Sequence, residues 1–182
     1  MEIERKFTIS RLPENLESYP CHIIEQAYLN TDPVVRIRRE DDSYYMTYKG
    51  KGLLAREEYN LPLNEHSYYH LREKADGNVI SKKRYVIPVE KPVFDMTYLS
   101  TINKSIDQIS LFVELDIFEA PFAPLIIAEV EFPDQEMAEA FQPLDWFSQD
   151  VTNDPAYHNS NLSKRKVQRL SDFSENSTYN RS

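Results

Sequence analysis

The sequence has 182 residues, a length that predicts one domain with enough chain for a hydrophobic core. Its formal net charge of -9 argues against a general nucleic-acid-binding protein, because such proteins are usually basic. The single cysteine, Cys21, excludes an intramolecular disulfide and fits a reducing compartment. The charged N-terminus is unlike a secretory signal, and no apolar run is long enough to span a bilayer. We therefore expect a soluble, cytoplasmic protein with no membrane partner.

The sequence contains three glycines, Gly50, Gly52 and Gly77. A Walker-type phosphate loop and a dinucleotide-binding loop each need several glycines at fixed spacing. Neither pattern is present in the sequence. If the protein binds phosphate groups, it must therefore bind them with side chains.

Alternating residue types predict extended segments over residues 2–7, 22–30, 34–40, 44–49, 55–63, 79–87, 111–118 and 126–132. Helical spacing predicts helices over 64–74 and 134–141, with Asn64 and Asp134 as N-caps, and a basic helix over 159–169. We expect a short strand near 97–99, a polar loop over 150–157 and a polar tail over 171–182. No internal repeat or linker divides the chain, so we expect a single domain over residues 1–170.

The first segment carries two carboxylates and an ammonium on one face of a strand. Side chains alternate between the two faces of a strand, so Glu2, Glu4 and Lys6 lie together, opposite Ile3 and Phe7. Carboxylates two residues apart can share a hard cation such as Mg²⁺, and the lysine can then meet an anion. A solvated edge strand of mixed charge is the simpler explanation of this segment taken alone.

The same pattern recurs on most of the expected strands, where charged rows back onto apolar rows. The basic members are Lys6, Arg36, Arg38, Lys49, Arg56, Lys82 and Arg84. The acidic members are Glu2, Glu4, Glu58, Glu114, Asp116, Glu129 and Glu131. An ordinary antiparallel sheet also has one polar face, which is the simplest explanation. Here, however, charges of like sign are neighbours, and this is unfavourable unless opposite charge lies between them.

A sheet closed into a barrel with its charged face inward would supply that arrangement. The basic rows would bind a polyanion of several phosphates, since arginine forks suit phosphate oxygens. The carboxylates would bind divalent cations that neutralise the same polyanion. The outward apolar rows would need helices or a partner subunit to cover them, so a homodimer is one expectation.

The charged segments, taken in order, resemble the CYTH superfamily, the triphosphate tunnel metalloenzymes. Glu2-Ile3-Glu4-Arg5-Lys6-Phe7 matches the ExExK signature of its short bacterial members. The resemblance continues through Arg36-Ile37-Arg38, Thr47-Tyr48-Lys49, Arg56-Glu57-Glu58-Tyr59, Lys82-Lys83-Arg84-Tyr85, Glu114-Leu115-Asp116-Ile117-Phe118, Ala128-Glu129-Val130-Glu131-Phe132 and the segments 150–157 and 159–162. ExExK alone is a weak pattern, but the ordered set is highly specific and covers nearly the whole chain.

The resemblance implies a mainly β fold of the α+β class, a closed antiparallel eight-stranded β-barrel tunnel with a charged interior and helices packed outside. It implies a divalent cofactor, Mg²⁺ or Mn²⁺. The implied metal ligands are Glu2, Glu4, Glu58, Asp116, Glu129 and Glu131. The implied phosphate-binding residues are Lys6, Arg36, Arg38, Lys49, Arg56, Lys82 and Arg84.

The segment Gln26-Ala27-Tyr28-Leu29 is similar to the Q-G-Y-L of short bacterial members, with Ala27 in place of the glycine. The resemblance implies a general acid/base role for Tyr28. A tyrosine ordinarily titrates at about 10, so this role requires neighbouring lysines to lower its pKa. Lys82 is the second catalytic candidate.

The sequence thus predicts a metal-dependent hydrolase of inorganic triphosphate or short polyphosphate. A nucleoside or thiamine triphosphatase is the alternative within the fold. An adenylate cyclase of class IV type is less favoured, because no adenine pocket can be argued from the sequence. A non-catalytic polyphosphate-binding module is the rival from another class.

Overall fold

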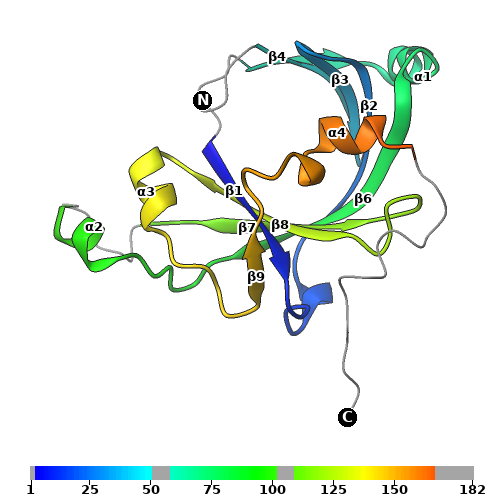
Figure 1. Ribbon diagram of the computed structural model, residues 1–182. Coiled ribbons are helices and arrows are strands. Elements are labelled where there is room, and N and C mark those ends of the chain that lie inside the picture. The colour runs from blue at the N-terminus through cyan, green and yellow to red at the C-terminus, as the bar shows by residue number, and fades with distance from the viewer. Residues whose placement is uncertain (1–2, 51–57, 102–108, 167–182) are drawn as a thin grey trace.

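The protein is described here by a computed structural model, which covers residues 3–50, 58–101 and 109–166 (Figure 1). Its strands are β1 (Ile3–Ile9), β2 (Cys21–Thr31), β3 (Val34–Glu40), β4 (Ser43–Lys49), β5 (Glu58–Leu63), β6 (Asp76–Pro88), β7 (Phe112–Phe118), β8 (Ile126–Phe132) and β9 (Phe147–Asp150). Its helices are α1 (Glu65–Arg72), α2 (Met96–Thr101), α3 (Gln135–Ala140) and α4 (Asn159–Lys164), with 3-10 turns at Leu16–Ser18 and Pro155–Tyr157.

All the strands belong to one sheet, in the order β5-β4-β3-β2-β6-β7-β8-β1-β9, and every neighbouring pair is antiparallel. The expectation of a mainly β, antiparallel fold is confirmed. The closed eight-stranded barrel is not confirmed: the sheet has nine strands, and β5 and β9 are its edge strands in the part of the chain that is described.

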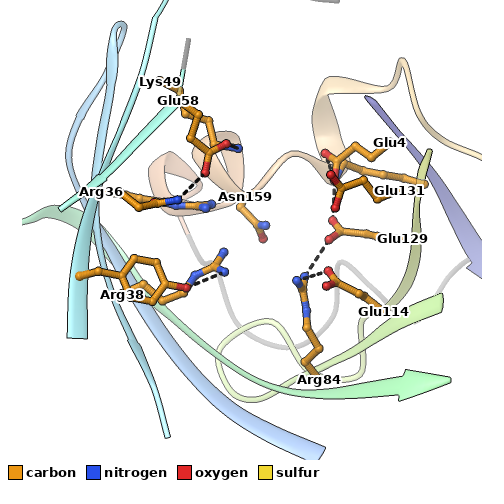
Figure 2. Close-up of a pocket in the computed structure, with 13 residues that line it drawn as sticks. Glu4, Arg36, Arg38, Lys49, Glu58, Arg84, Glu114, Glu129, Glu131 and Asn159 are labelled. Carbon is orange, nitrogen blue, oxygen red and sulfur yellow. Dashed lines mark hydrogen bonds and ion pairs between the residues drawn. The ribbon is translucent and has the colours of Figure 1, made fainter. Parts of the chain in front are cut away.

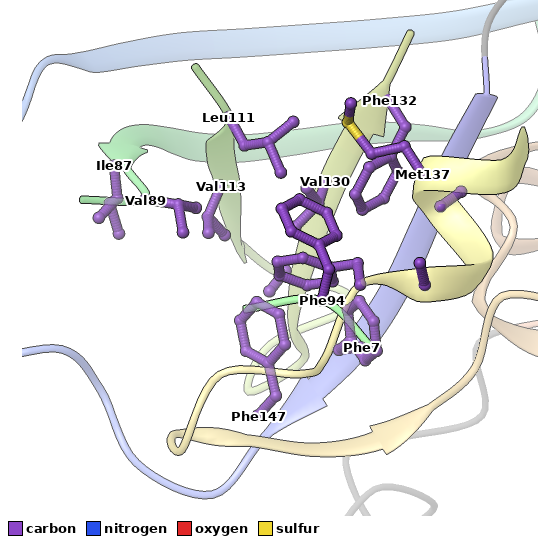
Figure 3. Packing of buried hydrophobic residues seen from close by; sticks show 14 of the residues in the cluster. Phe7, Ile87, Val89, Phe94, Leu111, Val113, Val130, Phe132, Met137 and Phe147 are labelled. Atoms are coloured by element: carbon purple, nitrogen blue, oxygen red, sulfur yellow. The ribbon is translucent and has the colours of Figure 1, made fainter. Parts of the chain in front are cut away.

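The sheet is strongly bent, which decides where its two faces lie. Figure 1 shows the bend along β2 and β6, so that β3 and β4 face β1 and β8 from opposite sides. The apolar rows of β1, β7 and β8 point to the outer side and pack against α3 in the main core. Figure 3 shows Phe7, Val130 and Phe132 in this core, beside Met137 of α3. A second outer cluster packs Tyr68 of α1 against Ala27 and Ile37.

Two of the expected helices begin where the sequence predicts. The Asn64 side chain accepts a hydrogen bond from the Ser67 amide at 2.8 Å and caps α1. Asp134 likewise accepts from the Met137 amide at 2.7 Å and caps α3. In both cases the side chain satisfies an amide that has no partner within the helix.

Two local expectations are wrong, and a third differs at its first residue. Residues 97–99, expected as a strand, belong to helix α2. The expected polar loop over 150–157 shares only Asp150 with β9, which pairs with β1 through Phe7 and Asp150. The helix expected over 159–169 ends at Lys164, because Arg165 has extended backbone. None of the helices within residues 3–50, 58–101 and 109–166 is long and apolar enough to cross a membrane.

Candidate active site

The inner face of the bent sheet carries the charged rows. The alternation of each strand fixes this face, and the register joins the rows across strands. Glu4 lies opposite Glu131, and Lys6 lies opposite Glu129, between β1 and β8. Glu114 of β7 lies opposite Glu129 in turn. Three neighbouring strands therefore present a nearly continuous row of carboxylates.

The basic residues of β3 and β4 face this acidic row. Arg36 and Arg38 alternate on β3, and the register places Lys49 of β4 near the end of the same face. Lys49 lies opposite Glu58 of β5, and the two form an ion pair with a 3.1 Å Nζ–Oε2 distance. In Figure 2 the arginines point across an open space toward Glu4, Glu129 and Glu131.

This space is a cavity of about 190 Å³ that is almost wholly polar. Seven strands and one helix contribute to its lining. The lining residues are Glu4, Lys6, Arg36, Arg38, Tyr45, Lys49, Glu58, Asn60, Arg84, Glu114, Glu129, Glu131 and Asn159. A cavity with one basic wall and one acidic wall can bind a polyanion together with the cations that neutralise it.

A layer of ion pairs lies at the floor of the cavity. Arg84 donates from Nε to Asp116 at 2.7 Å and from Nη2 to Glu129 at 2.7 Å, and it also pairs with Glu114. Asp116 is paired a second time, with Lys82. Lys82 and Asp116 have fully buried side chains and do not line the cavity. Their placement suits the orientation of Arg84 better than direct contact with a ligand.

The pKa values of the two buried lysines, Lys6 and Lys82, shift in opposite directions. Burial disfavours the charge of Lys6, but Glu129 and Glu4 outweigh it and hold the pKa of Lys6 above its usual range. Burial, together with Arg84, lowers the pKa of Lys82 to about 8, against the opposing effect of Asp116. The difference arises because Lys6 has two carboxylate partners, whereas Lys82 shares one carboxylate with Arg84.

The same ion pairs and burial also shift the pKa values of the carboxyl groups of Glu129 and Glu114. Burial acts to raise the pKa of Glu129, but Lys6 and Arg84 hold it well below its usual range. For Glu114 burial prevails, and the pKa of this carboxyl is raised in spite of Arg84. Glu129 therefore stays ionised as the counter-charge of two cations.

Arg38 is oriented by a buried amide that sequence reasoning did not assign. Its Nε and Nη2 donate to Oε1 of Gln26 at 3.2 and 3.0 Å, and Gln26 is fully buried. Nη1 donates to the Tyr45 hydroxyl at 3.2 Å, and that hydroxyl donates to Glu40. Burial and Arg36 lower the pKa of the Arg38 guanidinium. These hydrogen bonds hold the planar guanidinium group of Arg38 in one orientation beside the cavity.

The other expected site residues are distributed as follows. Glu4, Lys6, Arg36, Arg38, Lys49, Glu58, Arg84, Glu129 and Glu131 line the cavity together. Glu2 and Arg56 lie outside the described residues. Tyr28 is 3% exposed, packs with Ile80, Phe118 and Leu162, and does not line the cavity.

Tyr45, Asn60 and Asn159 line the cavity but were not assigned from the sequence. For Tyr45 and Asn60 a signal existed, because each alternates with charged members of the inner face. Asn159 comes from α4, which packs against β6 and β2. Only its place in the segment 159–162 could have indicated it.

The donor chemistry of the acidic wall fits a hard divalent cation. Glu4 and Glu131 offer carboxylate oxygens side by side in register and at the cavity surface. Within the described residues, no three His, Cys, Asp or Glu side chains form a ready metal cluster. This still fits Mg²⁺, which proteins usually bind with one or two carboxylates while substrate phosphates and water complete its shell.

Fold and site together define a protein in which a bent antiparallel sheet encloses a cavity with opposed basic and acidic walls. The chain belongs to the CYTH domain family, whose model matches residues 1–142. An inorganic triphosphatase of Nitrosomonas europaea is 33% identical over 165 residues, which cover 88% of this chain and 95% of that protein. An inorganic triphosphatase of Acetivibrio thermocellus is 32% identical over 169 residues, 90% of this chain and 93% of that protein.

A solved structure has a similar fold. The crystal structure of the inorganic triphosphatase NE1496 aligns with a TM-score of 0.60 and 28% identity, over 90% of this chain and 94% of that chain. The family resemblance expected from the ordered charged motifs is confirmed.

Proposed function

We propose that this protein hydrolyses inorganic triphosphate or short polyphosphate in a reaction that depends on a divalent cation. The observation that carries the proposal is the cavity in which Arg36 and Arg38 oppose Glu4 and Glu131, with Arg84 on the carboxylate side. Two relatives that match nearly the whole chain are inorganic triphosphatases, which supports the same activity here. Phosphoryl transfer needs mainly positioning and charge neutralisation, and this cavity offers both.

The basic wall would bind the phosphate chain. Arg36, Arg38, Lys49 and Arg84 present donors along the cavity, and Lys6 is kept charged by its carboxylate partners. Guanidinium forks bind phosphate oxygens in pairs, so the arginines would fix the direction of the chain as well as its place. The hydrogen bonds from Arg38 to Gln26 support this role, because a guanidinium group that is already oriented loses little conformational entropy when it binds phosphate.

The acidic wall would hold Mg²⁺ or Mn²⁺ through Glu4 and Glu131, with Glu2 of the same opening segment as a further ligand. A bound cation neutralises phosphate charge and lowers the pKa of a water molecule. Membership of the CYTH family supports a metal-dependent reaction. Glu129 would contribute by holding Lys6 and Arg84 in place.

The acid/base role of Tyr28 stays a prediction. Tyr28 lies opposite Arg36 in the register of β2 and β3, but its ring packs in the apolar cluster below α4. If its hydroxyl takes part in proton transfer, Tyr28→Phe lowers kcat and leaves KM unchanged. An unchanged kcat would reject the assignment.

The finer expectations about the whole protein also stay predictions. They are a closed tunnel around the substrate, a single domain over residues 1–170, a cytoplasmic location and a homodimer. The tunnel is supported by the cavity lining, to which strands from opposite ends of the sheet order, such as β5 and β1, contribute.

Orthophosphate release from tripolyphosphate, ATP and thiamine triphosphate, with Mg²⁺, with Mn²⁺ and with EDTA, tests the proposal. We expect release from tripolyphosphate with either metal, no release with EDTA, and much slower release from ATP and thiamine triphosphate. Preference for ATP or thiamine triphosphate would favour the alternative within the fold. Tight binding of tripolyphosphate without release under any condition would favour a binding module.

Two variants test whether the reaction takes place in the cavity. Arg36→Ala should raise KM or lower kcat sharply, because it removes a phosphate partner. Lys83→Ala is the matched control, since Lys83 is exposed on the same sheet and does not line the cavity. Equal loss of activity in both variants would place the reaction elsewhere.

A further inference from the structure

Asn159 differs from the other polar side chains of the cavity. It lines the cavity, and Figure 2 shows it between the arginine wall and the carboxylate wall. Its Oδ1 is buried and has no hydrogen-bond partner. Within residues 3–50, 58–101 and 109–166, it is the one buried side-chain oxygen in that condition. A buried acceptor without a partner is unfavourable, so a donor at this position would be favoured.

The neighbouring acceptors are already engaged. Oδ1 of Asn60 accepts from the Thr47 hydroxyl at 2.6 Å. The Tyr45 hydroxyl accepts from Arg38. Glu4 and Glu129 are paired with Lys6. Asn159 thus offers a neutral acceptor, whereas the acceptors of Asn60, Tyr45, Glu4 and Glu129 already serve cations or hydroxyls.

The helix that carries Asn159, α4, is held against β6. Asn78 of β6 donates from Nδ2 to the carbonyl oxygens of Ser163 at 3.2 Å and Arg165 at 2.7 Å, at the end of α4. Gly77 has φ +74, and a Cβ there would lie 2.1 Å from the Ser163 carbonyl oxygen, so α4 approaches the β6 backbone as closely as glycine allows. Leu162 anchors the helix in the apolar cluster with Ile80.

The chemistry of the ligand decides what the free acceptor can bind. Phosphate oxygens of an ionised triphosphate are acceptors themselves, so they cannot donate to an amide oxygen. A water molecule can donate. Hydrolysis, the proposed function on which this inference rests, needs one water molecule beside the terminal phosphorus.

We propose that Asn159 is a catalytic residue that orients the attacking water by accepting one of its hydrogen bonds at Oδ1. A lone pair of that water is then directed at the terminal phosphorus. A bond forms between the water oxygen and this phosphorus, and the bond from the phosphorus to the bridging oxygen breaks. The bridging oxygen stays with the pyrophosphate product, and the protons of the water leave with orthophosphate or pass to solvent. Side-chain amides that position a water in this way are known in other phosphoryl-transfer enzymes.

The test compares kcat and KM for tripolyphosphate with Mg²⁺ in the wild type, Asn159→Ala and Asn159→Asp. Binding of imidotriphosphate, which cannot be hydrolysed at its bridging nitrogens, is measured by calorimetry for each. We expect Asn159→Ala to lower kcat about 10²-fold while KM and the affinity for imidotriphosphate stay unchanged. Asn159→Asp keeps an acceptor at the site and should retain more of kcat, with a raised KM from its added charge.

Asn161→Ala is the control for effects on the helix, since Asn161 lies on α4 but its side chain donates to the Pro155 carbonyl oxygen, away from the cavity. A raised KM and weaker imidotriphosphate binding in Asn159→Ala, with kcat intact, would overturn the proposal in favour of a phosphate contact. Equal losses in Asn159→Ala and Asn161→Ala, with lowered melting temperatures, would overturn it in favour of a structural role. A wild type without hydrolysis would instead refute the proposed function before any variant is compared.

Discussion

At the scale of single residues, the buried pair of Lys82 and Asp116 changes how the charged rows should be understood. The alternation of β6 and β7 places both on the inner face, where sequence reasoning makes one a phosphate ligand and the other a metal ligand. In the structure both lie beneath Arg84, and Asp116 binds two cations at once. A carboxylate so engaged is better placed to hold Arg84 than to hold a metal ion.

The variant Asp116→Asn tests whether Asp116 stabilises the buried ion pairs or binds a metal ion. Removing one partner of a buried ion pair leaves an uncompensated charge and costs about 3–5 kcal/mol. We therefore expect Asp116→Asn to lower the free energy of unfolding in urea by about 3 kcal/mol or more, while the double variant Lys82→Met with Asp116→Leu is less destabilised. Metal affinity, measured by Mn²⁺ titration, should fall for Glu4→Gln but not for Asp116→Asn. Loss of Mn²⁺ binding in Asp116→Asn, with stability unchanged, would restore it as a metal ligand.

At the scale of elements, Arg5 connects β1 to two elements that lie far along the chain. It donates to Asp150 of β9 at 2.7 Å and to the carbonyl oxygens of Ala138 and Phe141 at 2.9 and 2.8 Å. Its guanidinium also lies 4.9 Å from the centre of the Phe7 ring. The outer face of β1 is therefore tied to α3 and β9, while its inner face carries Glu4 and Lys6.

The pH dependence of stability tests this connection. Burial acts to raise the pKa of Asp150, but hydrogen bonds from Thr152 and the charge of Arg5 lower it below its usual value. A carboxyl whose pKa is lowered in the folded state stabilises the fold above its unfolded pKa of about 4 and loses this contribution as the pH falls through the folded value. Asp150→Asn should therefore lower the free energy of unfolding at pH 7 by an amount on the order of 1 kcal/mol, because Asp150 is partly exposed, and the melting temperature should fall accordingly.

The difference in melting temperature between wild type and Asp150→Asn should shrink as the pH falls below about 4, where the wild-type carboxyl becomes protonated. In an Arg5→Met background the pH dependence of this difference should weaken. A difference that stays constant over the whole pH range would show that the charge of Asp150 contributes nothing.

How far the sequence predicts the elements depends on whether the signal is local. Arg36 and Arg38, or Glu129 and Glu131, alternate with apolar neighbours, and a strand is the local consequence. The caps at Asn64 and Asp134 are equally local. α2 also has a local signal that was missed, because the Asp95 side chain accepts from the Tyr98 amide at 2.8 Å, as an N-cap does.

β9 and the role of Gln26 could not be predicted in this way. β9 has only four residues, and its pairing with β1 brings together segments more than 130 residues apart. Gln26 looks like one polar residue on a strand, and its clamp on Arg38 exists only once β2 and β3 are in register. Such roles depend on tertiary contacts, which no local pattern contains.

At the scale of the whole molecule, the cavity is lined by cationic and carboxylate side chains from many strands, so a ligand bound there would stabilise the folded protein. Any ligand that binds only the folded protein stabilises it, by about 4 kcal/mol at roughly 1,000 times its dissociation constant. We expect tripolyphosphate with Mg²⁺ to raise the melting temperature of the wild type and of Lys83→Ala, and to raise that of Arg36→Ala much less. An equal rise in all three proteins would place the anion outside the cavity.

The crystal structure of the protein with imidotriphosphate and Mn²⁺ is the most direct test of the central claim, that the inner face of the bent sheet is the site of triphosphate hydrolysis. The account predicts phosphate oxygens within about 3 Å of the guanidinium groups of Arg36, Arg38 and Arg84. It predicts Mn²⁺ at Glu4 and Glu131, between these carboxylates and the phosphates. A phosphate chain bound outside the cavity, or Mn²⁺ bound away from both carboxylates, would contradict the account.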